Sequence, residues 1–367
     1  MKLFQIIFIL LNYINVISLK NLFILKNINK KNVLFLNKKD ETKEINEIKG
    51  TKEIKGKIDN VNNINNVKNN IENTRIEKIH YLFKLIRPNN IIPTTLLCFS
   101  GGWIMYPSIN NLFHSTPFLI SIINTLLIMS ASMVLNDIYD LEIDKINSKD
   151  RPLVTGKITK LEAFLFALSL IGSTEYLTFV YLPDSLKLII QLAIIQISIY
   201  TPILKKILFI KNISCAALVA FSLFFSGLSV SNNLSQMNKN LGLLSITMSV
   251  IFFGSLCNEI LLDIRDKEGD KMNNIITIPV VFGNNVALLI SSGILFFNVI
   301  SNSFSIMYLY NSLDKALLIP IIFSPLIINI YKIKKANFSE ESIVNYMKYS
   351  NYPLVILLIY ICKISLL

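Results

Sequence analysis

The sequence predicts an all-α polytopic membrane protein with about nine transmembrane helices. Of its 367 residues, 52% are hydrophobic and only 16% are charged, whereas a soluble domain usually has about a quarter of its residues charged. After residue 87 the apolar residues gather in about nine stretches, most of them close to the ~20 residues that a helix needs to cross a bilayer. These observations exclude an ordinary soluble domain.

Residues 1–80 differ from the rest of the chain and form the first of two predicted regions. Near Met1 the run LFQIIFILL is too short to span a membrane and resembles the core of a signal peptide. The segment that follows is rich in Asn, Lys and Ile and has no pattern that would bury a core. We interpret residues 1–80 as a signal-like or transit-like disordered leader and residues 81–367 as the membrane domain. Such a leader predicts an organelle membrane, plastid-like in preference to the mitochondrial inner membrane.

The nine apolar stretches follow one another with short connections. Several are shorter than 20 residues, so we expect tilted helices or helices that continue into the loops. Their approximate bounds are Ile91–Tyr106, Phe118–Leu135, Ala163–Leu182, Leu188–Leu204, Ile213–Val230, Leu241–Leu262, Val286–Tyr310, Ala316–Tyr331 and Pro353–Leu367.

Basic residues are distributed unevenly over the loops. When the loops are assigned alternately to the two sides of the membrane, one side receives most of the lysines and every arginine after residue 80. By the positive-inside rule this side is the cytoplasmic face or its equivalent in an organelle. The loops after the second and sixth stretches, which are rich in acids, both fall on it. The net charge of +12 follows from such interfacial lysines, so we predict no nucleic-acid partner.

Two acidic stretches, NDIYDLEIDK and NEILLDIRDKEGDK, carry the candidate chemistry. Each places three aspartates at positions i, i+3 and i+7, which lie on one face of a helix. In the first stretch an asparagine and two aspartates also recur at i, i+4 and i+8. The residues are Asn136, Asp137, Asp140 and Asp144 in the first stretch and Asp263, Asp266 and Asp270 in the second.

Six carboxylates at a membrane face need compensating positive charge. Each costs ~2.5 to 3.5 kcal/mol at membrane depth, and like charges on one helix face repel. Oxygen ligands without Cys or His select a hard cation, and Mg²⁺ typically combines one or two carboxylates with substrate phosphate oxygens. We therefore predict one Mg²⁺ on each stretch, with a diphosphate between them. The alternative is a pair of solvated loops balanced by lysines, and the matched spacing on one face argues against it.

The basic residues near these stretches are further candidates. Arg87, Arg151 and Arg265 are the only arginines after residue 80, and arginine offers a bidentate grip on phosphate or carboxylate that lysine lacks. Arg151 and Arg265 are expected to hold the diphosphate or to fix an aspartate. Lys205 and Lys206, which follow IYTPIL on the same side, are further candidates for phosphate binding, with interfacial anchoring as the alternative.

These motifs resemble those of the UbiA superfamily of intramembrane prenyltransferases. NDIYDLEIDKIN with the following RPLVTGKIT is similar to the first motif of that family, and DIRDKEGDK with TIPVVFG is similar to the second. YTPILKK followed by Asn212 resembles the segment after the fourth helix, and LIRPNN resembles the start of the first helix. The resemblance extends from about Tyr81 to the C-terminus and implies a UbiA-type helix bundle.

The resemblance also implies roles for individual residues. Tyr200 and Lys205 would contact the diphosphate, although four residues separate them here where some members have three, so Tyr200 is displaced or the helix end is wound differently. The implied catalytic residues are Asp140, Asp144, Asp266 and Asp270. The implied Mg²⁺ ligands are these four and Asn136. The candidate substrate-binding residues are Asn136, Arg151, Tyr200, Lys205, Lys206, Asp263 and Arg265.

The implied activity is Mg²⁺-dependent transfer of a polyprenyl, geranylgeranyl-like group from its diphosphate to an aromatic or lipid acceptor, in quinone or isoprenoid lipid biosynthesis. The ending Gly269-Asp270 and the TIPVVFG segment favour the branch that uses homogentisate, chlorophyllide or geranylgeranylglyceryl phosphate. A 4-hydroxybenzoate polyprenyltransferase of ubiquinone synthesis is the alternative.

Three further readings belong to other classes. A secondary transporter usually places its acids within spans and has broken helices, whereas these acids lie where two spans reach one face. A lipid-diphosphate hydrolase or a non-catalytic prenyl-lipid-binding membrane protein would keep the phosphate site and lack transfer to an acceptor.

Overall fold

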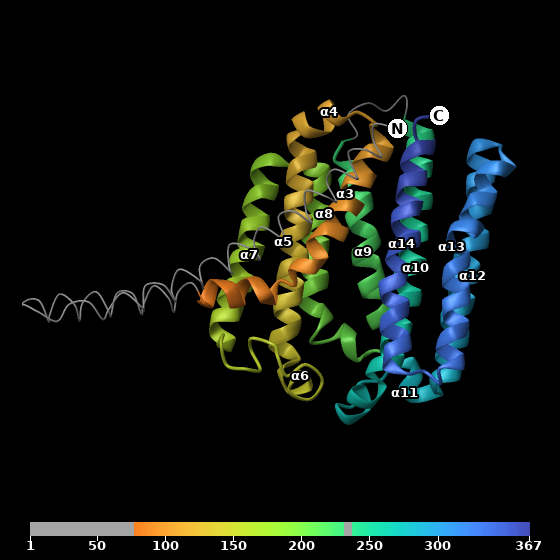
Figure 1. Ribbon diagram of the computed structural model, residues 1–367. Coiled ribbons are helices and arrows are strands. Elements are labelled where there is room, and N and C mark those ends of the chain that lie inside the picture. Colours follow the sequence, from red (N-terminus) through yellow and green to blue (C-terminus); the bar gives the residue numbers. More distant parts are fainter. Residues whose placement is uncertain (1–76, 231–236) are drawn as a thin grey trace, which may run out of the picture. The chain divides into compact units, whose positions relative to one another are not determined.

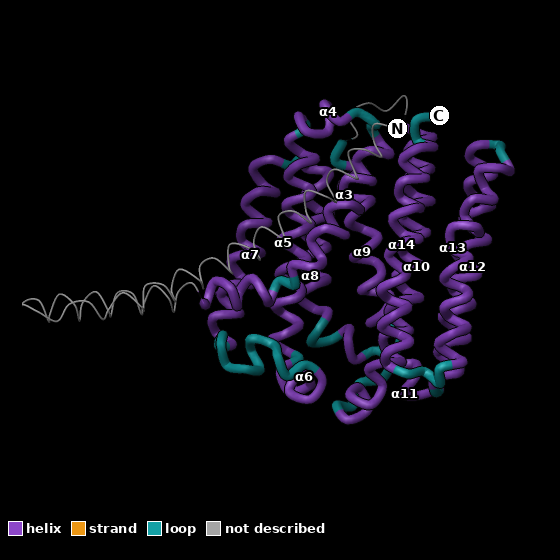
Figure 2. The backbone as a smooth tube through the Cα atoms, viewed as in Figure 1, coloured by secondary structure: helices purple, strands orange, loops and turns teal. Residues whose placement is uncertain are grey.

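The computed structural model describes residues 77–230 and 237–367, and nearly all of these residues are helical (Figures 1 and 2). No strand occurs in this part of the chain. The predicted leader, residues 1–80, lies almost wholly outside the described residues, so it stays a prediction.

Long helices occupy the positions of all the predicted apolar stretches. They are α3 (Ile91–Met105), α5 (Thr116–Tyr139), α7 (Lys160–Tyr181), α8 (Asp184–Tyr200), α9 (Ile210–Leu228), α10 (Met237–Met272), α12 (Asn284–Tyr310), α13 (Leu313–Lys335) and α14 (Glu340–Ile364). Six of them, α5, α7, α9, α10, α12 and α13, are long and apolar enough to cross a membrane. The all-α membrane fold is confirmed, and the count of nine crossings stays a prediction.

Short helices lie in the connections and complete the described part. They are η1 (Pro88–Asn90), α4 (Ile109–His114), α6 (Leu141–Asn147), η2 (Leu204–Lys206) and α11 (Ile278–Phe282). A further helix over residues 77–85 precedes η1. α11 is formed by the TIPVVFG segment, and η2 contains both candidate lysines of the α8–α9 connection.

Two helices are longer than the apolar stretches predict. α10 continues through the second acidic stretch to Met272, ten residues beyond the expected end at Leu262. α14 begins at Glu340 and not, as expected, near Pro353. At this start the Ser339 hydroxyl accepts a hydrogen bond from the Ser342 amide at 3.3 Å. Hydropathy detects only the part of a helix that lies in lipid, so polar turns outside it are missed.

The spacing of the first acidic stretch predicts that it continues the membrane helix before it. The structure shows two helices instead, with an interruption at Asp140. α5 ends at Tyr139, Asp140 has φ −86° and ψ 8°, and α6 follows. The Asp140 amide still donates to the Asn136 carbonyl, and the Asp144 amide to the Asp140 carbonyl, each at 2.8 Å. The helical hydrogen-bond pattern is therefore kept through the bend, and the acids remain stacked.

Both acidic stretches lie at the same end of the helix bundle formed by residues 77–230 and 237–367. Figure 1 shows α6 and α11 together at this end, with α4 and the C-terminus at the other. α6 contacts α10 there. This confirms the shared face that the alternation of loops predicts. Many large apolar side chains of α7, α8, α12 and α13 are exposed, as expected of surfaces that face lipid.

Helices α3 and α9 approach each other closely through glycines. A Cβ atom on Gly101 would lie 2.0 Å from the backbone oxygen of Leu223, and one on Gly227 would lie 3.0 Å from the backbone oxygen of Gly101. Small residues allow such contact between membrane helices. Because α3 and α9 both line the cavity described below, this contact fixes one of its walls.

We predict that Gly101→Ala destabilises the protein by about 1 to 3 kcal/mol, because the added methyl group meets backbone and forces the helices apart. The measurement is the midpoint of thermal unfolding of purified protein in detergent. Gly172→Ala, on the exposed side of α7, is the matched control, since a Cβ there has no neighbour within 4 Å. Equal midpoints for the two variants would contradict the close packing of α3 on α9.

Candidate functional site

Asp137 and Asp144 of the first acidic stretch are held by two arginines. Both carboxylates are buried, with 3% and 5% of their surface exposed. Arg151 Nη1 contacts Asp137 Oδ1 and lies 2.7 Å from Asp144 Oδ2. Arg87 Nη2 lies 3.0 Å from Asp137 Oδ1. The sequence predicts that Arg151 either holds the diphosphate or fixes an aspartate. In the structure its guanidinium group fixes two aspartates.

Arg87 has an unusual backbone at this position. Its φ is 51°, in the left-handed region that residues with a side chain rarely adopt. Strained backbone of this kind tends to occur where a side chain must be aimed at a site. Here it precedes η1 and directs the guanidinium at Asp137. The sequence singles out Arg87 as one of three arginines and assigns it no role.

Asp140 and Asn136 are contacted by the connection between α8 and α9. Lys205 Nζ donates to Asp140 Oδ2 at 2.5 Å, and the Thr201 hydroxyl donates to Asn136 Oδ1. Lys206, its neighbour in η2, is exposed instead. The two lysines that the sequence treats alike are therefore separated by the fold, and only Lys205 joins the acids.

Tyr200 lies at the end of α8, and its hydroxyl group hydrogen-bonds to a thiol instead of an aspartate. Its hydroxyl accepts a hydrogen bond from Cys215 Sγ at 3.0 Å, and the ring is buried. The structure therefore gives Tyr200 a place in the wall of a cavity and no contact with the acidic residues. α8 ends at Tyr200, and Lys205 lies in the separate short helix η2. The unusual spacing between the two residues therefore agrees with a helix end that is wound differently.

The second acidic stretch is neutralised mainly from the start of α9. Lys211 Nζ lies 2.6 Å from Asp263 Oδ1 and 3.6 Å from Asp270 Oδ2. The Asn212 amide donates to Asp263 Oδ2 at 2.8 Å. Lys211 is itself buried. Asp263 is thereby fully engaged by α9, whereas Asp270 Oδ2 is buried without a hydrogen-bond partner.

Arg265 and Asp266 form a pair of their own on α10. Arg265 Nε and Nη2 donate to the two oxygens of Asp266 at 2.7 and 2.8 Å. Both side chains are partly exposed, at 32% and 39%. The bidentate geometry expected of arginine is present, and its partner here is the adjacent carboxylate.

The segment 201–211, which comprises the α8–α9 connection and the first residues of α9, thus reaches both acidic clusters. Its first part contacts Asn136 and Asp140, and its last part contacts Asp263 and Asp270. A run of chain some ten residues long therefore lies between the two sets of acids. Positive charge from Lys205 and Lys211 is concentrated where a diphosphate would have to lie.

Asp144 shows the electrostatic cost of this arrangement. Burial raises the pKa of its carboxyl group to about 6, and the nearby Asp137 and Asp140 raise the pKa further, while Arg151 lowers it. Desolvation and like charge both disfavour the ionised form. A cation brought next to Asp144 would favour that form.

The oxygen atoms at this end of the bundle fit magnesium shared with a substrate. Among the described residues, no three His, Cys, Asp or Glu side chains converge closely enough to hold a metal ion alone. Each acidic stretch instead offers two or three carboxylates, and one of these, Asp270, has a buried oxygen, Oδ2, without a hydrogen bond. Mg²⁺ commonly binds one or two carboxylates and takes its other ligands from water and phosphate. The donor set therefore fits Mg²⁺ held together with a diphosphate.

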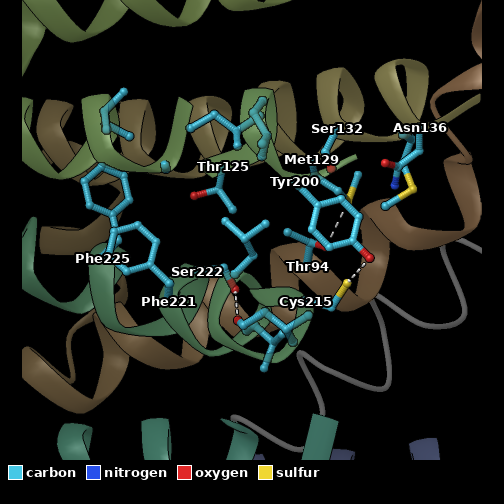
Figure 3. Close-up of a pocket in the computed structure, with 18 of the residues that line it drawn as sticks. Thr94, Thr125, Met129, Ser132, Asn136, Tyr200, Cys215, Phe221, Ser222 and Phe225 are labelled. Atoms are coloured by element: carbon cyan, nitrogen blue, oxygen red, sulfur yellow. Dashed lines mark hydrogen bonds between the residues drawn. The ribbon is translucent and has the colours of Figure 1, made fainter. Parts of the chain in front are cut away.

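A cavity of about 200 Å³ extends into the bundle from this site. It is enclosed by α3, α5, α8, α9 and α10, and its wall is mainly apolar. Figure 3 shows Asn136, Tyr200 and Cys215 at one end and Phe221 and Phe225 at the other. The two phenylalanine rings are stacked with their centroids 5.8 Å apart. One end of the cavity is therefore polar and joins the acidic site, and the other end is closed by aromatic rings.

Sequence reasoning missed Lys211, Thr201 and Glu259. Lys211 appears in the sequence only as one more lysine of the basic face, and its role depends on contacts with residues more than fifty positions away. Glu259 lies within the second acidic stretch and lines the cavity. Its spacing of i, i+4 from Asp263 was the signal that would have placed it on the same face.

Comparison with known proteins agrees with this geometry. A model of the UbiA prenyltransferase family matches residues 93–352. Similar proteins include the digeranylgeranylglyceryl phosphate synthase of Methanosphaera stadtmanae, 32% identical over 225 residues, which are 60% of this chain and 78% of that protein. The enzyme of the same name from Sulfolobus acidocaldarius is 32% identical over 58% of this chain and 73% of its own length.

Solved structures show the same fold. One, described as a digeranylgeranylglyceryl phosphate synthase in membranes, has a TM-score of 0.58 at 23% identity and covers 79% of this chain and 99% of its own. A UbiA homologue from Archaeoglobus fulgidus bound to DMAPP and Mg²⁺ has a TM-score of 0.52 at 20% identity, covering 77% of this chain and 98% of its own.

We predict that Arg151→Ala lowers the free energy of unfolding by about 3 kcal/mol, because it leaves Asp137 and Asp144 buried without their shared partner. Hydrogen exchange measured by mass spectrometry would show faster exchange over residues 140–158. Arg265→Ala is the control, since its pair with Asp266 is partly exposed and such pairs contribute ~0 to 1 kcal/mol. Equal effects of the two substitutions would contradict the bridging role of Arg151.

Proposed function

This chain belongs to the UbiA prenyltransferase family, and we propose that it transfers a geranylgeranyl-like group from its diphosphate to the hydroxyl group of a glyceryl phosphate lipid. The cavity is the observation that supports this most directly. It begins at Asn136, beside the acidic stretches, and ends at Phe221 and Phe225 (Figure 3). A prenyl diphosphate matches this cavity, because it has a charged head at one end and an apolar tail at the other. The head would lie at the acidic stretches and the tail in the cavity.

Magnesium would be held on two sides of the diphosphate. Asn136, Asp140 and Asp144 would hold it on one side and Asp266 and Asp270 on the other. Mg²⁺ bound there supplies positive charge that stabilises the leaving diphosphate. The homologue from Archaeoglobus fulgidus is bound to DMAPP and Mg²⁺, which supports Mg²⁺ as the cation.

The basic residues of the chain would act on the same leaving group. Lys205 and Lys211 carry fixed positive charge between the two acidic stretches, where they would donate hydrogen bonds to diphosphate oxygens. Such preorganised charge lowers the barrier to breaking the allylic carbon–oxygen bond. Arg151 would act indirectly, because it holds Asp137 and Asp144 in place. The apolar wall of the cavity would keep water from the allylic cation.

The acceptor is inferred from the relatives. Two similar proteins are named digeranylgeranylglyceryl phosphate synthases, which favours a lipid hydroxyl over homogentisate, chlorophyllide or 4-hydroxybenzoate. The relatives are archaeal lipid synthases and lend no support to quinone biosynthesis or to an organelle. The expected plastid-like membrane rests on the leader of residues 1–80 alone. Membership of a prenyltransferase family argues against the transporter and the non-catalytic lipid-binding protein.

The acceptor can be tested with the full-length protein in membranes. Labelled geranylgeranyl diphosphate and Mg²⁺ are offered with geranylgeranylglyceryl phosphate, homogentisate or 4-hydroxybenzoate. We expect a labelled product with the lipid, and none after Mg²⁺ is removed by a chelator. A product formed only with an aromatic acceptor would overturn the proposed acceptor and keep the enzyme class.

We predict that Asp140→Asn and Asp266→Asn each reduce transfer at least about 100-fold, because each removes a negative charge that would hold the Mg²⁺ on which departure of the diphosphate depends. Product formation is measured under saturating acceptor. Glu142→Gln is the matched control, since Glu142 lies beside Asp140 but is exposed and pairs only with Lys145. Full activity in either aspartate variant would remove that residue from the site.

A further inference from the structure

Glu259 is the acidic side chain of the cavity. Of the residues that line it, Glu259 alone among those described carries a carboxylate, and the others are apolar or neutral. It lies on α10 four residues before Asp263, hence one helical turn, or about 6 Å, deeper into the bundle than the acidic cluster. Glu259 therefore marks the junction between the place expected for the diphosphate and the place expected for the tail.

Among the described residues, Glu259 forms no ion pair, although the charges of Lys211 and Arg265 act on its carboxylate from a greater distance. The Cys215 thiol lies beside it, and that thiol in turn donates to the Tyr200 hydroxyl. The charged and titratable groups that interact with Glu259 are Cys215 and Lys211 of α9, Tyr200 of α8, and Asp263, Arg265 and Asp266 of α10. In the described part of the chain, no lysine or arginine forms an ion pair with Glu259.

This sets Glu259 apart from the six aspartates. Arg87, Arg151, Lys205, Lys211 and Arg265 pair with those aspartates. A carboxylate held by a cation is a weak base, because the cation favours its ionised form. Among the described residues, Glu259 forms no such ion pair, and Lys211 is already engaged by Asp263 and Asp270, so the Glu259 oxygen atoms are better placed to accept a proton within the cavity.

We propose that Glu259 is the general base that removes the proton from the acceptor hydroxyl, an inference that rests on the function proposed above. The bond between the allylic carbon and the diphosphate oxygen breaks, and the electron pair leaves with the diphosphate. A lone pair of the acceptor oxygen forms the new carbon–oxygen ether bond. The hydroxyl proton passes to a Glu259 oxygen and from there to water at the membrane face. Atoms and charge balance without a further reactant.

The position of Glu259 suits this step. The reacting carbon is the first carbon of the tail, directly next to the diphosphate, so it would lie where the acidic site meets the cavity. Asn136 and Glu259 both line the cavity at that level, from α5 and α10. A hydroxyl group that approaches the allylic carbon there would come within reach of Glu259.

The test compares Glu259→Gln, Glu259→Asp and the unmodified full-length protein in lipid nanodiscs. Glu259→Gln keeps the size and the hydrogen-bonding capacity and removes the basicity. We expect kcat with geranylgeranylglyceryl phosphate to fall about 100-fold or more, with little change in the affinity for geranylgeranyl diphosphate and Mg²⁺. At saturating Mg²⁺, which favours the ionised form of Asp144, the fall in kcat at low pH that the unmodified enzyme would show should be absent in Glu259→Gln and retained in Glu259→Asp.

Glu175→Gln is the matched control. Glu175 is a carboxylate in the membrane helix α7, bonded to Gln191 Nε2 at 2.6 Å and absent from the cavity wall. We expect it to have the kcat and pH profile of the unmodified protein.

Each other outcome contradicts a definite statement. Unchanged kcat and pH profile in Glu259→Gln would overturn the general base. Weaker binding of geranylgeranyl diphosphate together with a lower unfolding midpoint would assign Glu259 to structure and overturn it as well. No lipid product from the unmodified protein, with product formed on an aromatic ring, would instead overturn the proposed acceptor.

Discussion

Cationic side chains compensate the carboxylates at the ends of α5 and α10, and the rest of the site depends on this compensation. Asp137, Asp144, Asp263 and Asp270 are buried, and each would be costly without a partner. The cations come from other parts of the chain: the start of η1, the loop after α6, and the α8–α9 connection. The acids are therefore neutralised only when the helix bundle is assembled. The same ion pairs hold the loops at this end of the bundle in place.

Such a network contributes little to stability in comparison with apolar packing. Buried ion pairs lose in desolvation much of what they gain in attraction, so hydrophobic residues of similar volume are often as stable. The bundle has extensive apolar contacts of its own, chiefly among α9, α10, α12, α13 and α14. We therefore attribute the density of charge at this end to ligand binding. Among the described acids, Asp270 has a buried oxygen, Oδ2, without a hydrogen bond, which fits a role in binding a cation.

The cavity and the charged site form one amphipathic surface. From Asn136 inward the wall changes from polar to apolar and ends at stacked aromatic rings. Burying an apolar tail there would release about 25 cal/mol for each Å² removed from water, and the head would meet fixed charge. In the proposed binding mode Glu259, which lines the cavity together with Asn136, would lie beside the first carbon of the tail, so binding of head and tail would align the reacting atoms.

The sequence alone determined the class of fold, the presence of both acidic stretches at one membrane face, and the kind of ligand, a diphosphate bound with Mg²⁺. Those conclusions depend on local properties: apolar length, the alternation of basic loops, and spacing along one helix. Tertiary structure decided which basic residue meets which acid. Lys205 pairs with Asp140 while Lys206 is exposed, and Lys211 reaches Asp263 from more than fifty positions away. Which residues become partners depends on how the helices pack against one another, and the hydropathy of the sequence does not reveal this packing.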